Sequence, residues 1–408
     1  MPVGKHAAIR YRITVEEKGM AELTPYNTAN LAESVYTVNG DDAMALKLFL
    51  SSHLFKGPEK DTKMLKAEVG GRIFRHAVDN FGVMAKGAGP YKDDVFIIFR
   101  GTTKANENAD AITDARIGIC TSKTNLPVHI GFNNSFNSML PEIKEFLTEA
   151  ECKGTIHCIG HSLGGAVASL AADWVSNNLT NPVKLYTYGA PRVGTDWFVK
   201  STTDTIGYKN MHRVYHKTDP VPMVAIYPFK QAPYDHNGHF LPSNQPLTSG
   251  EAHFMRNYVA SVRNTSWEDL SDNPIEPYNI EIAIENWLKS KSPVDASSAS
   301  FWQWIDAALI YVIKKIAMGA VLLLQGAVIG LHTIVDKLAY ILAKGINLAE
   351  EISSWVILLM KKLMQALKIK VEATKEKLTR SMMRYVLTKM TEESTRNAQK
   401  AIRDIEKS

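Results

Sequence analysis

Cysteine is scarce in this chain, whose 408 residues include only Cys120, Cys152 and Cys158. Three cysteines are too few for the set of disulfide bonds that stabilises small secreted domains, so a disulfide-rich scaffold is excluded. The first ten residues, MPVGKHAAIR, also lack the apolar stretch of a secretory signal peptide. Both absences predict a protein that is made and folded in the reducing cytosol.

The sequence also lacks an internal repeat and an unusual composition. With 45% hydrophobic and 22% charged residues, it resembles an ordinary globular protein, and its net charge is +5. Residues 301–408 carry 17 Lys and Arg against 10 Asp and Glu, a net charge of +7 that leaves −2 for residues 1–300. A basic tail favours an anionic membrane or an acidic partner, but a solvated helical surface explains it equally well. We expect no nucleic-acid partner.

Short apolar segments at intervals along the chain predict the strands of a sheet. They are FGVMAKG (81–87), DVFIIF (94–99), TIHCI (155–159), KLYTY (184–188) and HRVYH (212–216). Helical patterns lie before and between them, at 26–50, 136–150 and 166–175. Apolar strands that alternate with helices are typical of a mostly parallel sheet covered by helices on both faces. The predicted fold class is therefore α/β.

The composition changes near residue 295. Residues 226–300 look irregular, being rich in Pro, Asn and Ser, and SPVDASSAS (292–300) has the composition of a linker. Beyond it, residues 301–370 are apolar with a helical pattern, and residues 371–408 favour a charged helix. We therefore expect an α/β domain over 1–295 and a helical C-terminal domain over 296–408.

One turn, GHSLG at 160–164, has the pattern G-x-S-x-G between an apolar strand and an Ala-rich helix. In a nucleophile elbow, a serine occupies the sharp turn from strand to helix, and glycines beside it avoid collisions with both elements. The N-terminus of the following helix favours negative charge. A plain strand–helix connection can show the same pattern, but the correct flanks predict that Ser162 is a catalytic nucleophile.

A serine nucleophile needs a base and an acid that orients the base. Asp219 follows the segment HRVYH and is the predicted acid, although an Asp before a proline also suits a turn. His236, His239 and His253 follow, and their spacing alone does not choose the base.

The reaction also needs donors for an oxyanion. One is expected at the backbone N–H of Leu163, directly after the serine. The other is expected at Thr102, in the turn after DVFIIF, which could offer both a backbone N–H and a hydroxyl.

Five motifs occur in order along the chain: FIIFRGTT (96–103), VHIGFNNSF (128–136), GHSLGGAVASL (160–170), YGAPRVG (188–194) and RVYHKTDPVP (213–222). With these five motifs, the chain resembles the class 3 lipases, a family of fungal-lipase-like α/β-hydrolases. The motifs are similar, in this order, to the family's oxyanion strand, V-H-x-G-F segment, nucleophile elbow, G-x-P-R-V-G turn and acid strand. The resemblance covers roughly residues 90–260 and implies an α/β-hydrolase fold.

The resemblance implies a catalytic set of Ser162 as nucleophile, Asp219 as acid, His253 as base, and Thr102 with Leu163 at the oxyanion hole. It implies neither a metal nor an organic cofactor. His253 is favoured because the family's histidine is commonly followed five positions later by a tyrosine, here Tyr258. The gap of 34 residues between Asp219 and His253 is shorter than in fungal members. His129 and His161 are expected to be structural.

The segment after Thr102 departs from the family's pattern. Fungal members have a short amphipathic lid helix there that carries a Trp, whereas KANENADAITDARIG (104–118) has no aromatic residue. Asp114 matches the family's aspartate. A lid this polar has little apolar surface to hide or expose, which argues against strong interfacial activation.

The tail contains a stretch without formal charge, IAMGAVLLLQGAVIGLHTIV at 316–335. It is long enough to span a bilayer, but its Gln, His and Thr residues make it a poor span. Residues 337–368 are amphipathic, which argues for a helical hairpin or bundle. Three interpretations stay open: a helical domain packed on itself or on the hydrolase, a membrane-binding device through 301–370, or a docking site for an immunity or delivery protein.

Together these features imply a serine esterase of acyl glycerolipids, with phospholipids as the first substrate class and neutral acylglycerols as the second. A hydrolase with a helical tail and no signal peptide is also similar to bacterial type VI secretion lipase effectors, which implies non-classical export and action at membranes. The alternative is a non-catalytic interaction or membrane-binding protein on a hydrolase scaffold.

Overall fold

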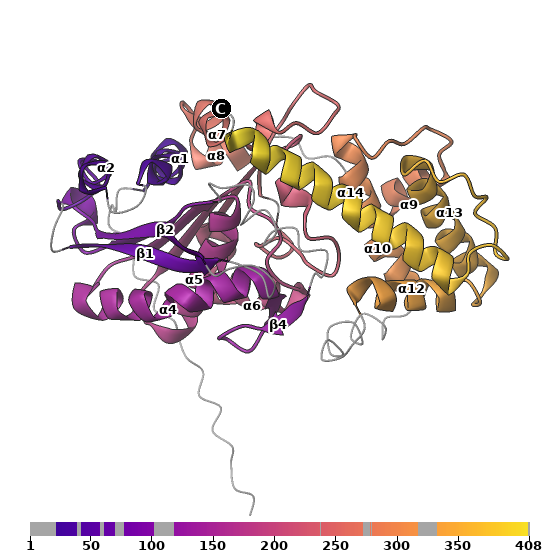
Figure 1. Cartoon of the computed structure of the whole chain (residues 1–408), viewed down its shortest axis with the longest axis horizontal. Coiled ribbons are helices and arrows are strands. Elements are labelled where there is room, and N and C mark those ends of the chain that lie inside the picture. The colour runs from indigo at the N-terminus through magenta and orange to yellow at the C-terminus, as the bar shows by residue number, and fades with distance from the viewer. Residues whose placement is uncertain are drawn as a thin grey trace, which may run out of the picture.

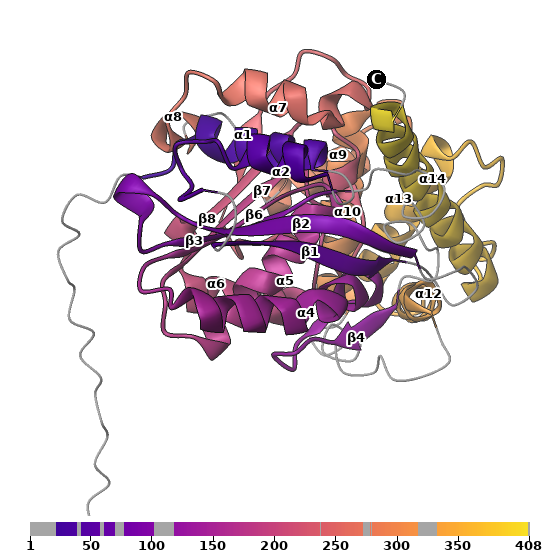
Figure 2. The same cartoon turned by 60° about the vertical axis from the view of Figure 1, so that its left-hand side comes forward.

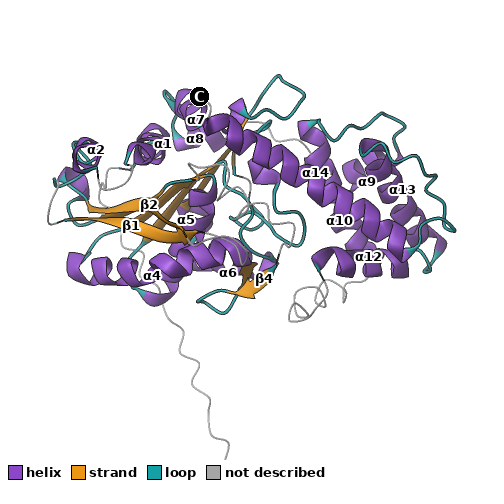
Figure 3. Cartoon of the chain, viewed as in Figure 1, coloured by secondary structure: helices purple, strands orange, loops and turns teal. Residues whose placement is uncertain are grey.

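The computed structural model describes residues 22–38, 42–57, 61–69, 77–101, 118–236, 238–271, 278, 280–316 and 333–406. Within these residues, a seven-stranded sheet is enclosed by helices, and a second cluster of helices lies beside it (Figure 1). Figure 3 shows that all strands of the large sheet lie in the first of these two parts.

The large sheet is antiparallel at one edge and parallel through the rest, in the order β1-β2-β3-β6-β7-β8-β9. β1, β2 and β3 pair antiparallel, and β3, β6, β7, β8 and β9 run parallel. The strands are β1 (Thr62–Val69), β2 (Ala77–Lys86), β3 (Val95–Phe99), β6 (Ile156–His161), β7 (Val183–Tyr188), β8 (Met211–His216) and β9 (His239–Leu241). β4 (Ile119–Thr121) and β5 (Pro127–His129) form a separate hairpin. The predicted α/β class is confirmed.

Helices cover both faces of the sheet, and each face has its own apolar core (Figure 2). One face carries α4 (Ile130–Ala150), α5 (Leu163–Asn178) and α6 (Asp196–Ile206), and the other carries α1 (Pro25–Ser34), α2 (Ala43–Phe49), α7 (Met255–Val262) and α8 (Trp267–Ser271). β3 and β6 are buried along their whole length, because helices cover both of their faces.

The second cluster consists of helices around one apolar core. They are α9 (Glu281–Lys289), α10 (Ala299–Ile316), α12 (Ile334–Gly345), α13 (Glu350–Ala366) and α14 (Arg380–Glu406). Met223 and Ile226 of the first part belong to the same core. The packing agrees with the first interpretation of the tail, a helical unit packed on itself and on the hydrolase.

Several boundaries differ from those expected. The helix expected over 26–50 is divided into α1, the 3-10 helix η1 (Val35–Thr37) and α2. The segment 226–300, expected to be irregular, contains β9, α7, α8 and α9, and the charged helix begins at Arg380. The division at residue 295 remains a proposal, and α9, which it places in the α/β domain, packs against α10 and α13.

The expected linker at 292–300 is anchored at its start. The ammonium group of the buried Lys362 donates to the carbonyl oxygens of Ser290 and Ser292, at 2.9 and 3.3 Å. Ser298 forms an isolated bridge with Leu247 just before α10 begins. This segment is therefore part of the packed structure.

In the part of the chain that the structure describes, no helix is both long and apolar enough to cross a bilayer. Residues 317–332, which make up most of the uncharged segment, lie outside the described residues.

Candidate active site

The turn between β6 and α5 places Ser162 at the carboxyl end of a central strand. Its backbone is strained, with φ 55° and ψ −131°, as a nucleophile elbow requires. A non-glycine residue in this region costs on the order of 1–3 kcal/mol, which the surrounding packing must offset. A Cβ on Gly164 would lie 2.5 Å from the carbonyl oxygen of Phe99, and one on Gly165 would lie 2.7 Å from the Ala190 Cβ. The glycines of the motif therefore permit close contact of α5 with the sheet.

Ser162, His253 and Asp219 form one hydrogen-bonded chain. His253 Nε2 lies 2.9 Å from Ser162 Oγ, and His253 Nδ1 lies 2.7 Å from Asp219 Oδ2. All three residues are buried, with exposures of 2%, 0% and 0%. Asp219 lies beyond the end of β8, and His253 ends the 3-10 helix η5 (Glu251–His253). The three side chains meet at the carboxyl edge of the parallel strands, where ligands of such sheets bind.

The Asp219 carboxylate accepts two further hydrogen bonds. Tyr258 Oη donates to Oδ2 at 2.6 Å, and the Val221 backbone N–H donates to Oδ1 at 2.9 Å. Burial and the neighbouring Asp219 raise the pKa of Tyr258 well above its ordinary value, so the phenol stays protonated and acts as the donor. These donors fix the carboxylate in the orientation that receives His253 Nδ1–H.

Gly189, in the segment YGAPRVG, leaves room for this pair. It has φ +54°, and a Cβ there would lie 2.6 Å from Asp219 Oδ2 and 3.0 Å from His253 Nδ1. A side chain at this position would therefore be strained and would displace Asp219 or His253.

A second buried network connects the two ends of the site. His161 Nε2 donates to the His253 carbonyl oxygen at 2.8 Å, because a carbonyl can only accept. His161 Nδ1 then accepts from Tyr36 Oη at 2.7 Å, and Tyr36 Oη accepts from the Gly101 N–H at 3.0 Å. Burial and the nearby His253 lower the pKa of His161 well below its ordinary value, which keeps the ring neutral. The network joins the end of β3 to the backbone of His253.

The other two histidine candidates lie elsewhere. His236 stacks on Tyr208 with ring centroids 3.9 Å apart, and His239 lies 3.2 Å from the ring nitrogen of His212. Both therefore have their own partners, whereas His253 reaches Ser162.

Of the predicted oxyanion donors, the structure describes one. Leu163 is the first residue of α5, where helical N–H groups have no acceptor within the helix. Thr102 and residues 104–117 of the predicted lid lie outside the described residues.

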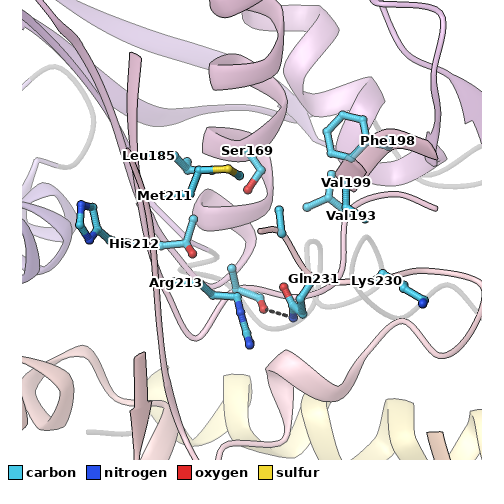
Figure 4. A pocket seen from close by; sticks show the side chains of 13 residues that line it. Ser169, Leu185, Val193, Phe198, Val199, Met211, His212, Arg213, Lys230 and Gln231 are labelled. Carbon is cyan, nitrogen blue, oxygen red and sulfur yellow. Dashed lines mark hydrogen bonds between the residues drawn. The ribbon is translucent and has the colours of Figure 1, made fainter. Parts of the chain in front are cut away.

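Residues of the triad line neither of two hollows in the structure. One is a cavity between α5, β7, β8 and Gln231, whose lining side chains are drawn in Figure 4. Its volume of about 10 Å³ holds roughly one water. The Gln231 amide donates to the Ala190 carbonyl oxygen at 3.0 Å. A cleft of about 510 Å³ lies between segment 229–236 and α10, where Arg192 and Asp306 form an ion pair at 2.8 Å.

Several of these residues had no sequence signal that would have marked them. Tyr36 lies 125 residues before His161 in the chain, in a segment that matches none of the motifs. His216 Nδ1 donates to the Ala252 carbonyl oxygen at 2.7 Å, next to His253, although HRVYH indicated only a strand.

The mostly parallel sheet, the strained serine turn and the Ser–His–Asp chain define the class of this protein as an α/β-hydrolase. Residues 96–229 match the model of a known family, Lipase (class 3). This match agrees with the resemblance to class 3 lipases that the motifs indicated.

Two curated proteins show similarity over shorter stretches. Secreted mono- and diacylglycerol lipase 1 of Fusarium solani is 40% identical over 98 residues, which cover 23% of this chain and 28% of the relative. Toxin TseL of Vibrio cholerae is 37% identical over 86 residues, which cover 21% of this chain and 13% of the toxin. The chain thus spans less than a third of either relative.

Among solved structures, the Lip2 lipase of Yarrowia lipolytica is similar to this chain, and the alignment covers 54% of this chain and 78% of the lipase chain. The TM-score is 0.38 and the sequence identity is 19%.

Proposed function

We propose that this protein is a serine esterase that hydrolyses acyl ester bonds of glycerolipids. The observation that carries the proposal is the hydrogen-bonded chain from Ser162 Oγ through His253 to Asp219, at 2.9 and 2.7 Å. The match of residues 96–229 to the class 3 lipase model supports the same chemistry.

In this mechanism, Ser162 Oγ attacks the ester carbonyl carbon while His253 Nε2 takes its proton. Asp219 accepts the Nδ1–H bond, which fixes the useful tautomer and stabilises the imidazolium. The backbone N–H of Leu163, with Thr102, binds the oxyanion of the tetrahedral intermediate. His253 then gives its proton to the leaving alcohol, and an acyl-enzyme remains.

Water completes the cycle. His253 takes a proton from water, the hydroxide attacks the acyl-enzyme, and a second tetrahedral intermediate collapses. The fatty acid leaves, and the proton returns to Ser162 Oγ. These steps require no metal and no organic cofactor.

Phospholipids are the first proposed substrate class, with neutral acylglycerols as the alternative. The segment between α13 and α14, together with the first residue of α14, exposes Lys368, Lys370, Lys375, Lys377 and Arg380, against Glu372 and Glu376. Such an excess of positive charge favours an anionic bilayer surface. The similarity to the Fusarium relative, a mono- and diacylglycerol lipase by name, supports the neutral alternative.

Turnover of p-nitrophenyl butyrate by the wild type and by Ser162→Ala tests the proposed chemistry. The variant should lose on the order of 10³-fold or more of the activity while keeping its melting temperature. Substantial turnover by a folded Ser162→Ala variant would refute the role of this serine.

A lipid panel then separates the two substrate classes. Vesicles of phosphatidylglycerol and phosphatidylcholine, and emulsions of diacylglycerol, are incubated with the enzyme, and mass spectrometry identifies the released fatty acids and lysolipids. Faster release from phosphatidylglycerol vesicles, reduced by 0.5 M salt, is expected. Release from diacylglycerol alone would assign the neutral class.

An exported antibacterial effector is a second candidate, favoured by the similarity to Toxin TseL. In that case the helical tail would bind a delivery or an immunity protein. Directing the wild type to the periplasm of a Gram-negative host should stop growth, whereas cytoplasmic protein and periplasmic Ser162→Ala should not. Equal growth in all three cultures would contradict the effector role.

A further inference from the structure

The last helix, α14, contributes to two different cores. Its first half supplies Met383, Leu387 and Met390 to the core of the helical cluster. Its second half supplies Ala398, Ala401 and Ile402 to the core of the α/β part, each no more than 1% exposed. Figure 1 shows the helix crossing from the helical cluster toward α7, where the chain ends. One continuous helix therefore connects the tail to the hydrolase.

The turn that carries the base and the turn that follows the acid both contact α14. One is η5 (Glu251–His253), which ends in the base, and the other is the 3-10 helix η4 (Val221–Met223). η4 begins two residues after Asp219, and the Val221 N–H donates to Asp219 Oδ1. The tail thus packs against two of the three chain segments that build the triad.

α14 packs closely against Gly250, at the start of the base-bearing turn. Gly250 opens this turn, and its carbonyl oxygen accepts from the His253 N–H at 3.0 Å. A Cβ on Gly250 would lie 2.6 Å from Asp404 Oδ2 and 3.2 Å from Ala401 Cα, both on α14. Ala401 is 1% exposed and belongs to the core of the α/β part, so a larger side chain there has to displace its neighbours or move the helix away from the turn.

The opposite side of the same turn is held by hydrogen bonds from the sheet. His161 Nε2 donates to the His253 carbonyl oxygen at 2.8 Å, and His216 Nδ1 donates to the Ala252 carbonyl oxygen at 2.7 Å. The turn is therefore held between the sheet and the last turns of α14.

We propose that the C-terminal end of α14 positions His253, with Ala401 and Gly250 as the positioning residues of this contact. The inference rests on the proposed serine esterase activity, and it gives the tail a part in setting the rate of ester cleavage without contact with substrate. A displacement of about 1 Å at a catalytic group can lower turnover by roughly 10²-fold. An overpacked contact between α14 and the turn should therefore act on kcat.

The first test compares two neighbouring positions of α14 in the full-length protein. Ala401→Leu adds bulk to the buried face of α14 beside the turn, whereas Lys400→Leu places the same side chain at an exposed position. With p-nitrophenyl butyrate, Ala401→Leu should lower kcat by about 10-fold or more and change KM by less than about threefold. The rate of Ser162 modification by a fluorophosphonate probe should fall in parallel, and Lys400→Leu should match the wild type.

A matched variant separates positioning from general destabilisation. Ala339→Leu overpacks the helical cluster at a fully buried residue of α12, remote from the turn in the chain and in the fold. It should lower the melting temperature as Ala401→Leu does, yet keep kcat within about twofold of the wild type. An equal loss of kcat in both variants at equal melting temperature would overturn the proposal.

A rescue experiment tests the contact from its other side, and decides the matter if Ala401→Leu does not fold. Gly250→Ala should lower kcat, because its methyl group meets the Asp404 carboxylate. Adding Asp404→Ala to this variant removes that carboxylate and should raise kcat at least about fivefold above that of Gly250→Ala. Asp404→Ala alone should leave kcat nearly unchanged.

Full activity of folded Gly250→Ala and Ala401→Leu would refute the positioning role. An inactive wild type would instead refute the proposed esterase function, so the two failures are distinguishable.

Discussion

Lowering the pH from 7.5 to 5.0 should destabilise the folded protein, and the part that His129 contributes can be worked out. This side chain is 1% exposed, and its Nδ1 accepts from the Gly131 N–H at 3.2 Å at the start of α4. Its ring stacks on Phe132 with centroids 4.2 Å apart. Burial lowers the pKa of His129 to about 4, so the folded protein holds it neutral.

The unfolded chain carries the same histidine with a pKa of about 6.5. Between pH 6.5 and 4, the unfolded state therefore binds a proton that the folded state does not. The contribution to stability is fully present above pH 6.5 and is lost as the pH falls. With a folded pKa of about 4, the loss at pH 5.0 is about 2 kcal/mol from this residue alone.

The substitution His129→Asn isolates this contribution, because an Asn side chain still accepts a hydrogen bond at a helix N-terminus but does not titrate. The free energy of unfolding is measured with urea at pH 7.5 and pH 5.0. The variant should be less stable at pH 7.5, since it loses the contact with Phe132, but its drop between the two pH values should be smaller than that of the wild type by about 2 kcal/mol. His236→Asn, at an exposed position, serves as the control. An identical drop in wild type and His129→Asn would refute the reasoning.

Three further outcomes concern the site. His253→Ala should be as inactive as the nucleophile variant while His239→Ala stays active, and the reverse result would reassign the base. Tyr36→Phe removes the hydroxyl that bridges His161 Nδ1 and the Gly101 N–H. The variant should therefore lower the free energy of unfolding by about 1–3 kcal/mol and slow ester turnover. Wild-type stability together with wild-type turnover would contradict the bridging role. Gly189→Ala places a methyl group 2.6 Å from Asp219 Oδ2 at φ +54° and should reduce kcat at least about tenfold. Steady-state kinetics measure this effect, and an unchanged kcat would contradict the prediction.

The parallel centre of the sheet could be predicted because burial on both faces leaves a direct trace in the sequence. β3 and β6 are buried throughout; β3 therefore appears as the unbroken apolar run VFIIF, and in β6 the apolar residues are interrupted by His157 and Gly160. β1 could not be recognised in the same way, because TKMLKAEV is an edge strand with lysines along it. β9 has three residues, too few to show any periodicity.

The candidate site was predictable to the extent that each group has a local signature. Ser162 sits in a turn whose glycines are adjacent in the chain, and Asp219 follows a strand end. His253 has no such signature, because it lies in a 3-10 turn, and only the resemblance to class 3 lipases favoured it over two neighbours. Tyr36 joins Gly101 to His161 across more than 60 residues of chain, and such a contact depends entirely on the tertiary fold.

For the same reason, the sequence alone does not reveal the proposed role of α14 in positioning His253. Residues 371–408 show a helical pattern, but a stripe of small and apolar residues does not reveal that its partner changes along the helix. Because all motifs lie before residue 260, the sequence alone suggests that a cut near residue 295 separates chemistry from membrane delivery. Such a cut also removes Ala398, Ala401 and Ile402 from the core of the α/β part. A fragment of residues 1–295 would expose the apolar surface beneath them and lose the support of the base-bearing turn. Low activity of that fragment on vesicles would therefore not show that the tail binds membranes, whereas single substitutions on the two ends of α14 in the full chain distinguish the two roles.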